Sequence, residues 1–84
     1  MDKTILVVDQ DRALAENLKE LIEFMDQPYV VTAVPTNWRQ RIGERRLEAV
    51  FVGPDLSDQD VSGLLADLKI FDPNVPVVMM QGKS

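Results

Sequence analysis

The sequence TILVVDQD, residues 4–11, is the stretch that decides the fold. Its first five residues are β-branched or apolar without interruption, a pattern typical of a short strand that is buried on both faces of a parallel sheet. The run is too short for the core of a signal peptide or for a membrane span. We therefore expect residues 4–8 to form a central parallel strand in a cytoplasmic protein.

The residues that follow predict an amphipathic helix and then a second strand. The helix is expected to run from Arg12 to about Met25, with Asp11 as its N-cap. Its apolar positions recur at helical spacing, and they are Leu14, Leu18, Leu21, Ile22 and Met25. Pro28 ends this helix, and the β-branched stretch at residues 29–34 predicts the second strand.

The second half of the chain repeats the alternation. A short helix is expected from Thr36 or Asn37 to about Gly43, with Trp38 and Ile42 on its buried side. Residues 47–52 and 75–80 predict the third and fourth strands. Between them, apolar residues at helical spacing predict a helix that is capped by Asp58 or Asp60 and that ends at Asp72-Pro73; the residues are Val61, Leu64, Leu65 and Leu68.

This alternation predicts an α/β fold of one domain, residues 1–84, with a parallel sheet and helices on both of its faces. Ligands of such folds bind beyond the carboxyl ends of the strands. No glycine-rich phosphate loop follows the first strand, which argues against a small nucleotide-binding domain of the flavodoxin type.

The composition excludes several kinds of chemistry. The chain has no cysteine and no histidine, so it has no disulfide, no thiolate metal site and no imidazole base. Its formal charge of −5 disfavours direct nucleic-acid binding. The local exception is a group of arginines that forms either a basic contact patch or the solvated face of a helix: Arg39, Arg41, Arg45 and Arg46.

Acidic residues gather where two predicted strands end. Asp9 and Asp11 follow the first strand, and Asp55 follows the third. Converging carboxylates can bind Mg²⁺, and an aspartate beside such a metal can attack a phosphoryl donor. Asp9 and Asp11 are therefore candidate metal ligands and Asp55 is a candidate phosphoacceptor, although Asp11 can also serve only as a helix cap.

The segments ILVVDQD, VFVGPDLSDQDVSGLL and PVVMMQG resemble the receiver (CheY-like) domains of two-component response regulators over essentially the whole chain. In that family the first strand ends in an acidic pair, the third in the phosphoaccepting aspartate and the fourth in a serine or threonine. The resemblance puts these functions at Asp9 and Gln10, at Asp55 and at Gln81. Gln10 and Gln81 thus replace a metal-binding carboxylate and the switch hydroxyl, which implies a degenerate pocket.

A narrower resemblance is carried by the segment Asn37-Trp38-Arg39 and by the glycine that ends the third strand. Both are similar to the amino-terminal domain of FleQ-type regulators of flagellar genes. The resemblance implies a domain that precedes an AAA+ ATPase acting on sigma-54 RNA polymerase and a helix-turn-helix DNA-binding domain, and that influences transcription without being phosphorylated.

Receiver domains have five βα units, and this sequence contains four strands, so the resemblance implies a fold truncated after the fourth strand. An uncovered fourth strand would be an apolar sheet edge able to pair with another chain. We expect either that the sequence is a segment of a longer protein or that the chain forms a homodimer through this association edge, whose residues are Val75, Val77, Val78, Met79 and Met80. The leading hypothesis is a regulatory module without enzymatic activity or a required cofactor. The alternative is a functional receiver that is phosphorylated at Asp55 with the help of Mg²⁺.

Overall fold

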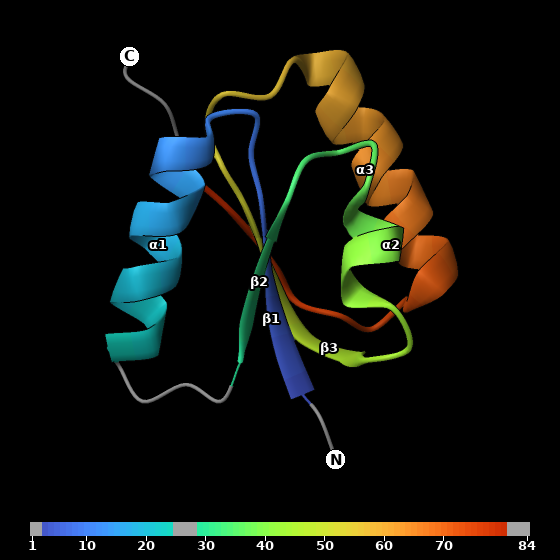
Figure 1. Ribbon diagram of the computed structural model, residues 1–84. Helices are drawn as coiled ribbons and strands as arrows, with labels where there is room; N and C mark the ends of the chain where they lie inside the picture. The colour runs from blue at the N-terminus through green and yellow to red at the C-terminus, as the bar shows by residue number, and fades with distance from the viewer. Residues whose placement is uncertain (1–2, 25–28, 81–84) are drawn as a thin grey trace.

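The computed structural model describes residues 3–24 and 29–80, and Figure 1 shows how the elements are arranged. In these residues the strands pair in parallel in the order β2-β1-β3-β4, which makes β1 central, as predicted. The α/β fold with a flavodoxin-like arrangement is therefore confirmed. Its elements are β1 (Lys3–Val8), α1 (Arg12–Phe24), β2 (Val30–Ala33), α2 (Trp38–Ile42), β3 (Arg46–Val52), α3 (Asp58–Phe71) and β4 (Val77–Met79).

The strand register fixes which residues share a face of the sheet. Val8 pairs with Ala33 of β2 and with Val52 of β3, whereas Val7 pairs with Thr32 and Phe51. Because successive side chains point to opposite faces, these two rows define the two sides of the sheet. In Figure 1, α1 covers the left-hand side, and α2 and α3 cover the right-hand side.

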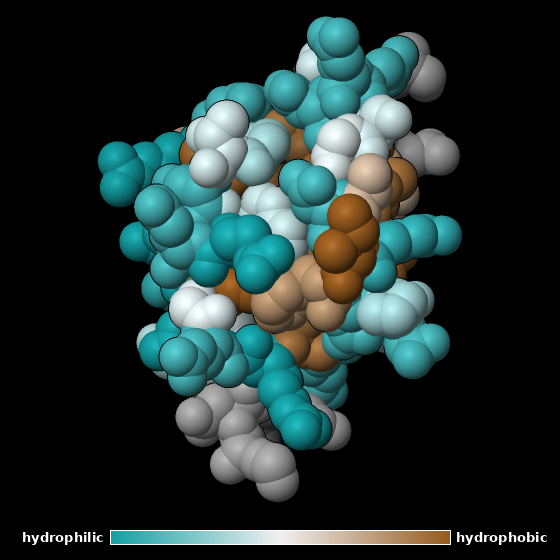
Figure 2. Space-filling model, turned by 90° about the vertical axis from the view of Figure 1, so that its right-hand side faces the viewer, coloured by the Kyte–Doolittle hydropathy of each residue, from teal (hydrophilic) through white to brown (hydrophobic). Residues whose placement is uncertain are grey.

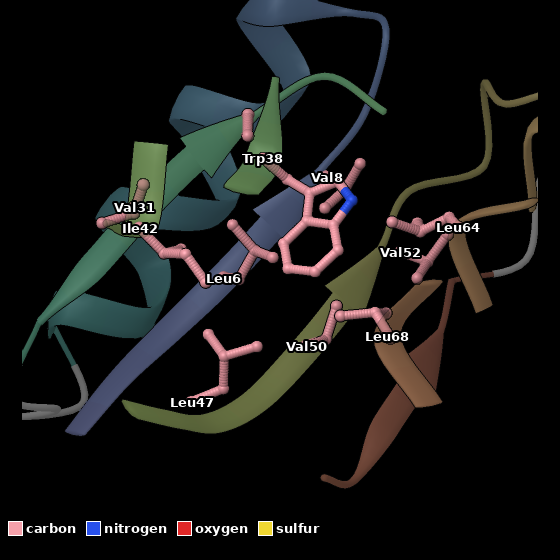
Figure 3. Close-up of a cluster of buried hydrophobic side chains, with 11 residues drawn as sticks. Leu6, Val8, Val31, Trp38, Ile42, Leu47, Val50, Val52, Leu64 and Leu68 are labelled. Atoms are coloured by element: carbon pink, nitrogen blue, oxygen red, sulfur yellow. The ribbon is translucent and has the colours of Figure 1, made fainter. Parts of the chain in front are cut away.

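The side covered by α2 and α3 contains the larger part of the core. Trp38 is 2% exposed, and its ring contacts Phe71 of α3 edge to face, with 5.6 Å between the ring centroids. In Figure 3, Leu64 and Leu68 of α3 point toward the strands, and the Trp38 indole lies beside Leu6 and Val8. The prediction that Trp38 anchors the short helix α2 is thus confirmed.

The side covered by α1 is packed less completely. Its buried residues are fewer, and a cavity of about 380 Å³ opens between α1 and the sheet, lined mainly by apolar residues that include Leu18, Phe51 and Met80. Leu21, which the helical spacing places on the buried side, is 59% exposed because it lies at the rim of this cavity. A single helix cannot cover the full width of the sheet on this side.

Element boundaries differ from the predictions at several ends. The cap of α3 is Ser57, whose hydroxyl accepts a hydrogen bond of 3.1 Å from the Asp60 backbone N–H, so the prediction of Asp58 or Asp60 was wrong. Asn37 precedes α2 but does not cap it, because its Oδ1 accepts from the backbone N–H of Val34 (2.9 Å). Gly43 ends α2 with a φ of 59°, which a glycine adopts without a steric cost.

Helix α1 ends at Phe24, and Met25, the last apolar position predicted for it, lies outside the described residues. Within residues 3–24 and 29–80, no helix has the length and apolar character that crossing a bilayer requires.

Candidate functional site

The candidate site lies at the carboxyl ends of β1 and β3. The register brings Val8 opposite Val52, so the next residues, Asp9 and Gly53, are also neighbours. Two backbone hydrogen bonds continue the sheet past its last pairs: Gly53 N–H donates to the Val8 carbonyl (2.8 Å), and Asp9 N–H donates to the Ala33 carbonyl (3.0 Å). Both residues are therefore held by the sheet rather than by a free loop.

Asp9 is buried to an extent that is unusual for an aspartate. Its exposed fraction is 1%. One carboxylate oxygen, Oδ1, accepts a hydrogen bond of 3.0 Å from the Asp11 backbone N–H. The other, Oδ2, is buried and finds no hydrogen-bond partner within the described part of the chain. A buried carboxylate that is only half satisfied is destabilising in its charged form.

Gly53 leaves the space that this carboxylate occupies. A Cβ atom at position 53 would overlap Oδ2 and Cγ of Asp9 and would lie 2.8 Å from its Cβ. Any other residue at this position would therefore need a displacement of the Asp9 side chain. The Asp9 carboxylate thus occupies the space that a side chain at position 53 would need.

Burial raises the pKa of Asp9 above its ordinary value of 3.8. The hydrogen bond from the Asp11 backbone opposes this rise, and the negative charge of the nearby Asp55 adds to it. The shift means that Asp9 takes up a proton more readily than an exposed aspartate does, because its charged form is penalised by burial.

The other predicted pocket residues that the structure describes are exposed, in contrast to Asp9. Asp55 is exposed and lies two residues beyond the position that faces Asp9, which is Gly53. Asp11 is exposed and caps α1, since its Oδ1 accepts from the backbone N–H groups of Ala13 (3.0 Å) and Leu14 (3.2 Å). Gln10 is exposed, and Gln81 lies outside the described residues.

These donors fit Mg²⁺ poorly. The ion prefers near-octahedral oxygen ligands at carboxylates that can keep their charge. Asp11 already uses its carboxylate at the helix cap, and the carboxylate of Asp9 is buried with only 1% of the residue exposed. In the described ranges, no group of three or more acidic side chains is placed to hold a metal ion. The roles of Asp9 and Asp11 as metal ligands, and of Asp55 as phosphoacceptor, stay predictions.

The arginine group is mostly engaged within the domain. The Arg39 guanidinium lies 4.7 Å from the ring centroid of Phe71, and that of Arg45 lies 4.4 Å from the ring of Tyr29. Arg41 Nε donates to the Thr32 carbonyl (3.0 Å). These contacts support a structural role for three of the four arginines, whereas Arg46 is exposed at the start of β3.

The predicted association edge is a sheet edge in the described structure. Strand β4 pairs with β3 on one side only, and Val78 and Met79 are 41% and 47% exposed. Val75 and Met80 are half-buried and lie outside β4, although Met80 N–H still donates to the Val52 carbonyl (2.8 Å). Pairing of this edge with another chain stays a prediction.

Sequence reasoning missed the contact between Asp9 and Gly53. It used the glycine at the end of the third strand only as a mark of resemblance. The available signal was positional: a glycine directly after one strand and an aspartate directly after its parallel neighbour meet at the same edge of a sheet.

The family model of the flagellar regulatory protein FleQ matches residues 4–84, which include all of the site residues named above. No curated protein and no solved structure matches the chain. The chain therefore belongs to the family of the flagellar regulatory protein FleQ.

Proposed function

We propose that this chain is a degenerate receiver domain that regulates flagellar transcription through protein–protein association, and that it is neither an enzyme nor a phosphoacceptor. The family match supports a flagellar regulatory role. The observation that carries the rest of the proposal is the pairing of buried Asp9 with Gly53 at the carboxyl ends of the two central strands.

This pairing disfavours phosphorylation for a geometric reason. A receiver needs its acceptor carboxylate at the end of the third strand, facing the acidic residues of the first. In this chain the residue that faces Asp9 at the end of β3 is Gly53, which has no side chain, and the candidate acceptor Asp55 lies two residues farther along the chain. In our proposal this domain therefore acts through protein–protein association rather than through a phosphoryl group.

Association is supported by the free edge of β4. Val50 N–H donates to the Pro76 carbonyl and Met80 N–H to the Val52 carbonyl, so residues 76, 78 and 80 turn their backbone groups toward β3. By alternation, the backbone groups of Val77 and Met79 point away from the sheet. An edge of this kind can add a strand from another molecule.

Exposed apolar surface adds to this support. Figure 2 shows brown, apolar surface among hydrophilic side chains on the side of the molecule that carries α2 and α3. Ile70 of α3 is 81% exposed. Met79 shares a face of the sheet with Val52, its partner in β3, and is 47% exposed on that side. Burial of such side chains would favour a dimer.

The test is a measurement of mass by sedimentation across a dilution series. We expect a dimer that dissociates on dilution, and a weaker dimer for Met79→Pro, because proline removes an outward N–H without breaking the ladder to β3. Met79→Lys, a charged edge residue, is a second variant that keeps the backbone donor.

The matched control is Phe24→Ser, which removes an 87% exposed apolar side chain from the end of α1. It should leave the dimer unchanged. A chain that is monomeric at every concentration would contradict the association, and equal weakening by Phe24→Ser and by both Met79 variants would show that general hydrophobicity, rather than the β4 edge, holds the dimer together.

A second function has one observation in its favour. The negative charge of Asp55 is near enough to Asp9 to raise its pKa, so the two carboxyl groups are neighbours. In this alternative Asp55 accepts a phosphoryl group in the presence of Mg²⁺. Incubation with Mg²⁺ and a small phosphodonor, followed by mass spectrometry, distinguishes the two functions: a stoichiometric adduct that is lost in Asp55→Asn would overturn our proposal.

In the parent regulator, we propose that the AAA+ ATPase and DNA-binding domains perform ATP hydrolysis and DNA recognition, and that this segment makes no direct contact with DNA or membrane. The net charge of −5 and the intramolecular contacts of Arg39, Arg41 and Arg45 support that division.

A further inference from the structure

The free edge of β4 presents few backbone groups, and their spacing limits how a second chain can pair with it. Val77 and Met79 direct their N–H and C=O groups away from β3, whereas residues 76, 78 and 80 turn theirs toward it. Val75 is the preceding residue of the outward series, and its N–H already donates to the Asp72 carbonyl (3.3 Å). Within residues 75–80, the outward N–H donors that remain for another chain are those of Val77 and Met79.

A closed pair of identical chains has a two-fold axis, and this axis determines the direction of the two β4 strands. If the strands ran parallel, the axis would place identical residues at the same level, so that outward residues would face each other. A parallel ladder instead needs the outward residues of the two strands at alternating levels. In an antiparallel pair, two opposite outward residues exchange both of their N–H···O=C bonds. A symmetric dimer through this edge is therefore antiparallel.

Among the antiparallel registers, the one centred on Val78 uses both outward residues. It places Val77 of each copy opposite Met79 of the other, and each of these pairs exchanges both of its hydrogen bonds. A register centred on Val77 would oppose Met79 to Val75, whose N–H is already engaged. A register centred on Met79 would move the axis to the last residue of β4 (Val77–Met79). Only the register centred on Val78 overlaps the two strands over their whole length.

The side chains of this edge also favour a second copy as the partner. At the axis Val78 would face its own counterpart in a non-hydrogen-bonded pair, in which the side chains lie close together and β-branched residues pack well. Val78 pairs with Phe51 of β3 and therefore lies on the side of the sheet that α1 covers only in part. No residue from 75 to 80 is charged, so the pairing would bring no like charges together at the axis.

We propose that two copies of this chain join their β4 strands antiparallel about a two-fold axis at Val78 and so form one continuous sheet. This inference rests on the association through β4 that is proposed above and adds the arrangement of the second copy. A two-fold axis perpendicular to the sheet keeps each face of one copy beside the same face of the other. The two cavities on the α1 side, each lined by Phe51 and Met80, then open on the same face of the joined sheet.

The test uses single cysteines, because the chain has none of its own. Val78→Cys, Val77→Cys and Met79→Cys are oxidised by dioxygen with a copper catalyst, at a concentration at which sedimentation shows a dimer. In the proposed register the two Cα atoms of position 78 lie about 4.5 Å apart, a distance that a disulfide can span. Val78→Cys should cross-link at least about tenfold faster than the other two, whose Cα atoms lie about 7–8 Å from their counterparts.

Met79→Cys is the matched control, since Met79 and Val78 are similarly exposed, at 47% and 41%. Phe24→Cys, at a highly exposed position away from this edge, gives the rate of cross-linking by random collision. Sedimentation of each variant under reducing conditions shows whether the substitution itself weakens the dimer, and the cross-linking rates are compared at equal fractions of dimer.

The outcomes separate this arrangement from association in general. Faster cross-linking at position 77 or 79 than at position 78 would overturn the proposed register and leave association through β4 intact. A dimer in which none of the three edge variants cross-links faster than Phe24→Cys would overturn pairing through β4 altogether. A chain that sediments as a monomer at every concentration would remove the association on which this inference rests.

Discussion

Replacing Gly53 by alanine should destabilise the domain far more than a glycine-to-alanine change usually does. The new Cβ would overlap Oδ2 and Cγ of Asp9 and lie 2.8 Å from its Cβ. Asp9 cannot easily retreat, because its backbone N–H is bonded to Ala33 and its Oδ1 to the Asp11 N–H. The side chain must therefore leave its buried place or push the two central strands apart.

The magnitude follows from two costs. Overpacking of a filled interior costs about 1–3 kcal/mol, and loss of the hydrogen bond from Asp11 adds about 0.5–1.5 kcal/mol. We expect Gly53→Ala to lower the free energy of unfolding by about 1.5–4.5 kcal/mol, the sum of these two ranges. Urea unfolding followed by the fluorescence of Trp38, which is 2% exposed in the folded state, measures it directly.

A double-mutant cycle identifies Asp9 as the cause. In an Asp9→Ala background the overlapping carboxyl atoms are gone, so the cost of Gly53→Ala should fall by at least about 1 kcal/mol. Gly63→Ala is the matched control: it lies inside α3 with nothing within 4 Å of its added Cβ, and it should stabilise the helix by about 0.5–1 kcal/mol. A cost below about 0.5 kcal/mol for Gly53→Ala, or strictly additive costs in the cycle, would refute the reasoning.

Three further substitutions address separate contacts. Asp9→Asn should stabilise the domain at neutral pH, because the pKa of Asp9 is raised above 3.8 in the folded state and ionisation of Asp9 therefore lowers the free energy of unfolding as pH rises. Urea titrations at several pH values measure this gain, which should vanish below pH 3.8, where Asp9 is protonated in both states. Ser57→Ala removes the α3 cap and should cost about 1 kcal/mol by the same assay, whereas Ser57→Asp should restore it. Arg39→Ala should cost about 0.5–1 kcal/mol through its contact with Phe71, while Arg46→Ala should cost less than half as much; equal losses would contradict a role for the aromatic contact.

The sequence predicts the fold well where hydrophobic patterning is strong. Residues 4–8 lie in the central strand, because an uninterrupted apolar run is best buried on both faces of a parallel sheet. Trp38 and Ile42 are buried, because residues four apart share one face of a helix and that face packs on the sheet. Strand β4 is shorter than predicted, since proline and exposure at its start limit its pairing with β3. Leu21 is exposed because helical spacing gives the direction of a side chain but not the width of the surface that α1 can cover.

The site is predicted less completely because it depends on contacts between segments. An aspartate after a strand can bind a metal, cap a helix or be buried, and the sequence leaves these alternatives open for Asp9 and Asp11. The fold distinguishes them: Asp11 bonds the first turn of α1, and Asp9 turns inward against Gly53. The space around a glycine is a property of its neighbours, so no spacing along the chain reveals it.

The pairing of Asp9 with Gly53 also bears on how such a domain could change its function. A carboxylate added by Gly53→Asp would restore an acceptor at the strand end, but its Cβ would meet the same overlap with Asp9 as alanine does. Regaining phosphorylation would thus require at least two coordinated changes, one that adds the acceptor and one that turns Asp9 outward to where a metal ion can reach it. Either change alone would destabilise the protein or leave the pocket closed, which gives a physical reason why a domain of this kind would keep an output other than phosphorylation, such as the association that we propose.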